Sequence, residues 1–172
     1  TQVHPSPYAS GSAGRLALQA NGKFVVVGSV NVGVFFDYDM AVVRYNADGS
    51  LDSAFDGDGI VTANLGTVPS TGSPYAMTVQ ADGNAVIVGG MYTESGGEDI
   101  FALRLNADGS PDPGFGVNGI VTIDNDEHSN DDSAGVAVLA DGKVLVAGHS
   151  NANFYLYRLL SDGSLDASFA SG

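Results

Sequence analysis

Short apolar stretches alternate with glycine-centred turns along the whole chain. Segments such as Phe24–Gly28 are rich in β-branched residues and too short for helices. At three places an Asx-Gly pair stands between two apolar stretches, and such a pair supplies the two positive φ angles of a type I′ hairpin turn. The pattern therefore predicts β-hairpins. The three pairs are Asn21-Gly22, Asp82-Gly83 and Asp141-Gly142.

A third apolar stretch follows each hairpin and predicts a third strand. In the first of these stretches Ala41 and Val43 alternate with Met40 and Val42, so both faces of the strand are apolar. A sheet with two apolar faces is expected to be covered on both sides. A GIVT segment then predicts a short fourth strand. The third strands are predicted at 40–45, 100–105 and 154–159, and the GIVT strands at 59–62 and 119–122.

The same order of elements occurs three times, so the chain is built from repeats. The segment NADGSLDSAF at 46–55 returns as NADGSPDPGF at 106–115 and as LSDGSLDASF at 160–169. The third copy is shorter between its second and third strands, so one loop tolerates a change of length. Small sheets with two apolar faces, repeated along a chain, are typical of β-propellers, in which the sheets stack around an axis.

We therefore predict an all-β fold, a β-propeller-type array of three four-stranded antiparallel blades in a single repeat domain, residues 1–172. Residues 1–15 are expected to hold a closing strand and its connection. Residues 16–75 form the predicted first blade and residues 76–134 the second. Residues 135–172 form the third, which lacks its last strand.

The first residues have the spacing of a fourth strand. Thr1 precedes Gly22 by 21 residues, which is also the distance from the first GIVT threonine to the next turn glycine. We expect Thr1, Gln2 and Val3 to complete the third blade, in the same chain or in another. Propellers usually have about four to eight blades, so two chains that exchange these strands would form a ring, and successive donation would form a filament. A longer array of repeats, or a boundary that falls here by chance, would give the same spacing.

The repeat resembles a known family. Its pattern is ALQ-x-DGK-x-x-VAG, then R-x-N-x-DGS-x-D-x-x-F, then G-x-V-T, and from about residue 16 to the end it is similar to the bacterial delta-60 repeat. The third copy departs from the pattern at Leu160, and the second carries Pro111 and Pro113 after its turn. The resemblance implies β-propeller-like blades in large secreted or surface proteins of bacteria. It implies no activity.

Charge and composition limit the kinds of partner and site that the chain can have. Six basic and 20 acidic residues give a net charge of −14, which disfavours nucleic acid and anionic membrane surfaces. The chain has no cysteine, which excludes disulfides and thiolate metal sites. No apolar run approaches the length of about 20 residues that a membrane span needs, so no membrane insertion is expected. An acidic, lysine-poor repeat rich in Gly, Ser and Asp favours an extracellular or cell-surface location.

The DGS turns look like half of a calcium loop but lack its other ligands. If Asp48 and Gly49 are aligned with the central Asp-Gly of an EF-hand, Arg44 and Phe55 stand where carboxylates belong. We predict instead that the aspartate bonds the local backbone, and that the arginine pairs with the second aspartate, because an arginine on an apolar strand face needs a partner. The predicted turn residues are Asp48, Gly49, Asp108, Gly109, Asp162 and Gly163, and the predicted ion pairs are Arg44–Asp52, Arg104–Asp112 and Arg158–Asp166.

Acidic residues are densest in one predicted loop, at 124–132, and a second acidic loop is expected at 94–99. The first is the calcium candidate, with a solvated loop as the alternative. No nucleophile–base–acid set stands out, and the three histidines do not have metal-ligand spacing. The candidate calcium ligands are Asp124, Asp126, Glu127, Asp131 and Asp132.

The sequence favours a non-enzymatic, secreted or cell-surface β-propeller repeat module for protein or glycan interaction or adhesion. One alternative is a structural subunit that assembles by donating its N-terminal strand. The other is a glycan-acting enzyme, although no paired carboxylates recur. Expected partners are a second copy, further repeats of a longer parent chain, or a protein or glycan ligand. No cofactor is expected, unless the acidic segment binds calcium.

Overall fold

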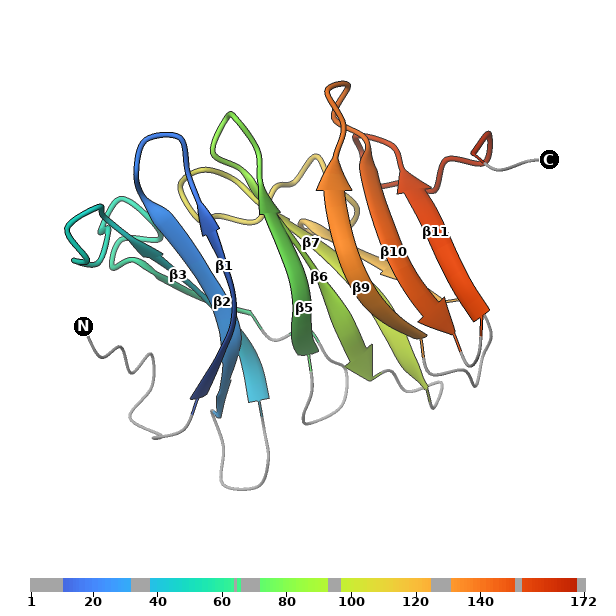
Figure 1. The fold of residues 1–172 in the computed structure, drawn as a ribbon, viewed down its shortest axis with the longest axis horizontal. Helices are drawn as coiled ribbons and strands as arrows, with labels where there is room; N and C mark the ends of the chain where they lie inside the picture. The colour runs from blue at the N-terminus through green and yellow to red at the C-terminus, as the bar shows by residue number, and fades with distance from the viewer. Residues whose placement is uncertain are drawn as a thin grey trace.

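The computed structural model describes residues 11–31, 38–63, 65, 72–92, 97–124, 131–150 and 153–169. These residues form three antiparallel sheets and no helix, so no helix there is long and apolar enough to cross a membrane (Figure 1). Blade 1 consists of β1 (Gly11–Leu18), β2 (Phe24–Asn31), β3 (Tyr38–Tyr45) and β4 (Ile60–Ala63). Blade 2 consists of β5 (Gly72–Val79), β6 (Ala85–Tyr92), β7 (Glu98–Leu105) and β8 (Ile120–Ile123). Blade 3 consists of β9 (Asp131–Val138), β10 (Val144–Ser150) and β11 (Asn153–Leu159).

The predicted all-β array of propeller-type blades is confirmed. In each sheet the strands that are neighbours in the chain are also neighbours in space. Blade 3 has three strands among the described residues. Thr1, Gln2 and Val3, which were predicted to supply its fourth strand, lie outside the described residues.

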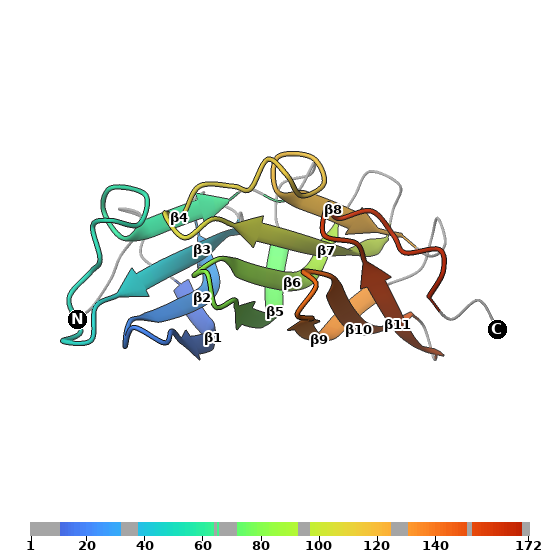
Figure 2. The same ribbon diagram turned by 90° about the horizontal axis from the view of Figure 1, so that it is seen from above.

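The three blades lie side by side with their faces against one another. Strands β1, β5 and β9 follow one edge of the row, and β4 and β8 follow the opposite edge (Figures 1 and 2). Strand β5 contacts β1, β2 and β3 of blade 1, and β9 contacts β5, β6 and β7 of blade 2. Blade 2 is therefore enclosed between two neighbours, as the apolar character of both its faces requires.

Two apolar clusters fill the spaces between the blades. The first joins the face of blade 1 that carries Val27 and Met40 to the facing side of blade 2. The second joins the other face of blade 2, which carries Val88 and Ile100, to the facing side of blade 3. Each cluster draws on two blades, so no blade builds a core alone, which is the usual energetics of a repeat protein.

The hairpin turns are not type I′ as the Asx-Gly pairs predicted. The amide of Gly22 donates to the carbonyl of Gln19 (3.0 Å), the amide of Gln19 donates to Lys23 O (2.8 Å), and only Gly22 has a positive φ. This is a type I turn followed by a left-handed glycine. Oδ1 of Asn21 accepts a hydrogen bond from the Lys23 amide (3.0 Å). The backbone of Asn21 does not adopt the left-handed conformation that a type I′ turn would require. The same bonding pattern closes the turns at Gly83 and Gly142.

The first strand of each blade begins before the predicted start of that blade. Strand β1 begins at Gly11 rather than at residue 16, and β5 at Gly72 rather than at residue 76. Strand β9 begins at Asp131 rather than at residue 135. Register shifts interrupt all three pairings between first and second strands, so the strand starts lack the alternation that sequence analysis relies on.

Candidate functional site

Each blade carries an arginine clamped between an aspartate and a phenylalanine, which we call the Arg–Asp–Phe clip. In blade 1 the Nε of Arg44 donates to Oδ2 of Asp52 at 2.6 Å, and its Cζ lies 4.6 Å from the centre of the Phe55 ring. Both charged side chains are buried, and the stacking adds a cation–π interaction. The clip of blade 2 is Arg104–Asp112 (2.7 Å) with Phe115 (4.5 Å), and that of blade 3 is Arg158–Asp166 (2.8 Å) with Phe169 (4.4 Å).

The turn after the third strand builds the clip. The amide of Asp52 donates to Arg44 O (3.0 Å), and the amide of Phe55 donates to Asp52 O (3.0 Å), so the chain folds back beside the arginine. At the tip, Oδ1 of Asp48 accepts both the amide (2.9 Å) and the hydroxyl (2.6 Å) of Ser50. These bonds to Ser50 hold the pKa of the Asp48 carboxyl below its usual range, and Ser110 and Ser164 do the same for Asp108 and Asp162.

The clip of blade 1 contains a second cation, Lys23. Burial alone would raise the pKa of Asp52, but bonds from Lys23, the Ala54 amide and Arg44 outweigh burial, and the pKa is lowered. The Lys23 ammonium lies 2.7 Å from Asp52 Oδ2. A carboxylate with two cationic partners stays ionised and holds the arginine in place.

The clip also reaches the next blade, which the sequence analysis missed. Arg44 Nη1 donates to the carbonyl of Ala107, in the DGS turn of blade 2. In the same way Arg104 Nη1 donates to the carbonyl of Ser161, in the DGS turn of blade 3, at 2.8 Å. The regular spacing of arginine and phenylalanine was the available signal, because the phenylalanine recurs without being needed for a turn.

A second bond seats the DGS turns of blades 2 and 3 on the preceding blade. The amide of Asp56 donates to Asp108 O (2.7 Å), and the amide of Gly116 donates to Asp162 O (2.8 Å). Gly163 has a φ of +88°, and a Cβ on it would lie 2.6 Å from Val121 Cγ2. Glycine is therefore required there both by the backbone conformation and by the close approach of blade 2.

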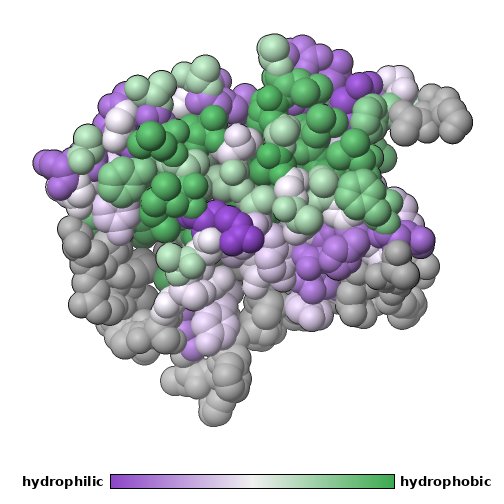
Figure 3. Space-filling model, viewed as in Figure 1, coloured by the Kyte–Doolittle hydropathy of each residue, from purple (hydrophilic) through white to green (hydrophobic). Residues whose placement is uncertain are grey.

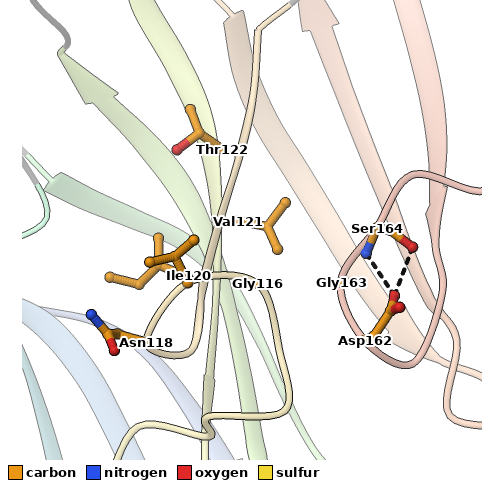
Figure 4. A pocket seen from close by; sticks show the side chains of 9 residues that line it. Gly116, Asn118, Ile120, Val121, Thr122, Asp162, Gly163 and Ser164 are labelled. Carbon is orange, nitrogen blue, oxygen red and sulfur yellow. Dashed lines mark hydrogen bonds between the residues drawn. The ribbon is translucent and has the colours of Figure 1, made fainter.

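A shallow hollow of about 610 Å³ lies beside this contact. Figure 4 shows the Asp162–Ser164 turn on one side and Gly116 with Val121 on the other. The hollow forms where the DGS turn of blade 3 meets β8 and the loop before it, and backbone and aliphatic groups form most of its lining. It lies at the seam between blades 2 and 3.

Acidic side chains gather at the opposite end of the sheets. Carboxylate oxygens of Asp99, Asp124 and Asp131 lie within 4.8 Å of one another, and Asp99 and Asp131 are buried. Oxygen ligands of this kind suit calcium, which takes about 6–8 of them. The structure thus brings together two of the predicted ligands, Asp124 and Asp131, and adds Asp99. Asp126 and Glu127 lie outside the described residues, and calcium binding stays a prediction.

Two acidic segments that were predicted as loops contribute to strands. Glu98 and Asp99 begin β7, and Asp131 and Asp132 begin β9. The pairing of β9 with β10 runs to Ser150, opposite Asp131, so backbone hydrogen bonding continues into the polar segment. Oδ2 of Asp132 lies 3.7 Å from Nε2 of His149, which belongs to β10.

A half-buried carboxyl with a raised pKa lies near this end. Burial raises the pKa of Glu98, and the charge of Asp132 adds to the effect. Tyr75 donates its hydroxyl to Glu98 Oε1 at 3.1 Å, and burial, followed by the charge of Glu98, raises the Tyr75 pKa to about 12. A carboxyl of this kind holds a proton to higher pH than an exposed glutamate.

The stacked antiparallel sheets place the chain in the β-propeller class. A model for the family described as "Domain of unknown function (DUF5122) beta-propeller" matches residues 19–55, 80–115 and 139–169, and the chain belongs to this family. Each matched segment begins at a hairpin turn and ends at a clip phenylalanine. The match supports a β-propeller repeat and leaves the resemblance to the delta-60 repeat as a prediction. No curated protein and no solved structure matches the chain.

Proposed function

We propose that this chain is a non-enzymatic β-propeller module that binds another macromolecule through the exposed outer face of its third blade. The observation that carries the proposal is a difference between blades 2 and 3. Ile100 and Ala102 on β7 are fully buried under blade 3. Phe154 and Leu156 hold the same positions on β11, and they are 75% and 45% exposed.

We call this surface the blade 3 outer face. Leu145 pairs with Arg158, Ala147 with Leu156, and His149 with Phe154, and directly paired residues point to the same side of a sheet. A separate group of apolar side chains lies along the upper part of β1, β5 and β9, on the edge of the row (Figure 3). Contiguous exposed apolar surface is typical of an interaction site.

The recurrent polar residues support a scaffold rather than a catalyst. In every blade the clip arginine and aspartate bond each other, and in blades 1 and 2 the arginine also bonds the next turn. These contacts join blades and leave the blade 3 outer face for binding. We favour a protein ligand over a glycan because the blade 3 outer face resembles a surface that another blade covers. We place the module outside the cell or at its surface, which its acidic, lysine-poor composition supports.

Site-specific photo-crosslinking tests the proposal. A photoreactive residue at Leu156 reports on the blade 3 outer face, and one at Val117, which is 76% exposed on a loop, is the control. With the chain in its native cells and medium, we expect crosslinks to protein or glycan at position 156 and few at position 117. Equal yields at the two positions would contradict binding through this face.

A further inference from the structure

We propose that the blade 3 outer face binds blade 1 of a second copy of this chain, in the arrangement by which each blade here binds the next. The inference rests on the proposed function and names its partner. The interface it requires is already present twice within the chain, once between blades 1 and 2 and once between blades 2 and 3.

Both internal interfaces use equivalent residues. The clip arginine of one blade bonds the carbonyl of Ala107 or Ser161 in the next turn. The amide after the clip phenylalanine bonds the carbonyl of Asp108 or Asp162, one residue further along that turn. In blade 1 the position of Ala107 and Ser161 is held by Ala47. A second copy therefore offers Arg158 the same backbone acceptor.

Blade 3 carries the donor half of such an interface in assembled form. Arg158 is held by Asp166 and stacked on Phe169, as its counterparts are in the covered blades. Its side chain is 24% exposed, against 7% for Arg44 and 11% for Arg104. The fixed guanidinium requires little ordering on binding, which lowers the entropic cost of association.

Blade 1 carries the acceptor half. Met77 of β5 and Val136 of β9 pack against the apolar clusters that join their blades to the preceding one. Leu16 holds the same position in β1 and is 65% exposed, and Leu18, two residues on, is 71% exposed. Both ends of the row thus present exposed apolar side chains, Phe154 and Leu156 at one end and Leu16 and Leu18 at the other. Because the surfaces differ, the contact is heterologous, and it closes into a ring or continues as a filament.

Charge sets the expected salt dependence. Each copy has a net charge of −14, so two copies repel each other at low ionic strength. The proposed contact consists of apolar surface and arginine–carbonyl bonds, which salt weakens little. Association is therefore tighter in about 0.5 M than in about 0.05 M sodium chloride. An interface based on ion pairs between copies would show the opposite dependence.

A pair of complementary variants tests the inference by sedimentation velocity on the 172-residue chain. Leu156→Asp places a charge on the donor half, and Leu16→Asp places one on the acceptor half. Alone, each variant associates at least about 30-fold more weakly than the wild type, the effect of losing one central contact. Mixed in equal amounts, they form a one-to-one dimer, because each retains the half that the other lacks. Val117→Asp adds the same charge at a loop position and assembles like the wild type.

Each failure has a distinct meaning. Circular dichroism and thermal midpoints equal to those of the wild type show that the variants fold. A wild-type chain that stays monomeric at all concentrations overturns the inference, as does a variant mixture that does not pair. If the wild type is monomeric while crosslinks at position 156 join a different protein, the proposed function stands and only this inference fails. If neither association nor crosslinks occur, both fail.

Discussion

Blades 2 and 3 carry the same motif in different surroundings. Arg104, Asp112 and Phe115 of blade 2 lie under a neighbouring blade, and Phe115 is fully buried. Arg158, Asp166 and Phe169 of blade 3 make the same contacts among themselves, with no further blade described beyond them. The geometry of the clip is thus internal to each blade, whereas the neighbour contributes to the burial of its arginine and phenylalanine. In a repeat protein the stabilisation of one motif therefore depends on its place in the array.

The largest effect is expected from removing the clip ring in the covered blade. Phe115→Ala leaves a cavity beneath Arg104 and against the turn of blade 3, and should lower the free energy of unfolding by about 3–5 kcal/mol. Phe169→Ala removes the same ring from a half-buried position and should cost less than about half of that. Urea unfolding followed by circular dichroism measures both. Equal losses would mean that burial by the neighbouring blade contributes nothing.

A smaller effect is expected at the turn glycines of blade 3. Gly163→Ala and Gly142→Ala impose the same backbone penalty, about 1–2 kcal/mol, since φ is +88° and +82°. At Gly163 the new methyl group also meets Val121 and the Gly116 amide, whereas at Gly142 its nearest neighbour is Ser161 at 3.5 Å. Gly163→Ala should therefore cost about 1–3 kcal/mol more. Thermal unfolding of the two variants under one set of conditions gives the difference in stability. An equal loss of stability in both would show that the close contact at Gly163 has no effect.

The smallest effect concerns the other end of the sheets, where no clip is present. The raised pKa of Glu98 means that the folded protein holds this proton more tightly than the unfolded chain does. Its stabilising contribution is complete below the ordinary glutamate pKa of 4.5 and is lost as the pH rises through the raised value. Glu98→Gln does not titrate and can still accept the Tyr75 hydroxyl. Near pH 7 the variant should therefore have a higher thermal midpoint than the wild type. The gain in the free energy of unfolding should be no more than about 1 kcal/mol, because solvent screens a half-buried group.

The comparison across pH supplies the control for that variant. The turn aspartates have lowered pKa values, so both proteins lose stability as the pH falls below the ordinary aspartate value of 3.8. Both proteins share this loss, so it does not change the difference in stability between them. That difference should close toward pH 4, because Glu98 of the wild type becomes protonated there. A constant gap at every pH would show that the substitution acts through packing instead of charge.

Much of the fold follows from local sequence signals. Short β-branched stretches with turn glycines predict strands β2, β3, β6, β7, β10 and β11, and the GIVT segments predict β4 and β8. The spacing of Arg44 and Asp52 places the two residues beside each other, because the DGS turn reverses the chain between them. These features depend on residues close in sequence.

The features that sequence analysis missed depend on contacts between blades or on continued strand pairing. The bond from Arg104 to Ser161 joins residues far apart in the chain, and no local pattern specifies how one sheet is placed on the next. Asp99 and Asp131 lie in acidic segments that were predicted to be loops. In the structure β7 pairs with β6 through Asp99 to Glu98, and β9 pairs with β10 as far as Asp131, so both strands extend into these segments. The Asx-Gly pairs identify the hairpins correctly but not the turn type, which follows from loop length.

The seating of each DGS turn on the preceding blade has an evolutionary consequence. The bonds that seat these turns join one position of the repeat to a fixed position of the following repeat, as Asp56 to Asp108 and Gly116 to Asp162 show. Duplication or deletion of a whole repeat in the gene would thus regenerate the same seam between the units that remain. Arrays of different length can arise in single genetic steps without any new contact surface having to evolve.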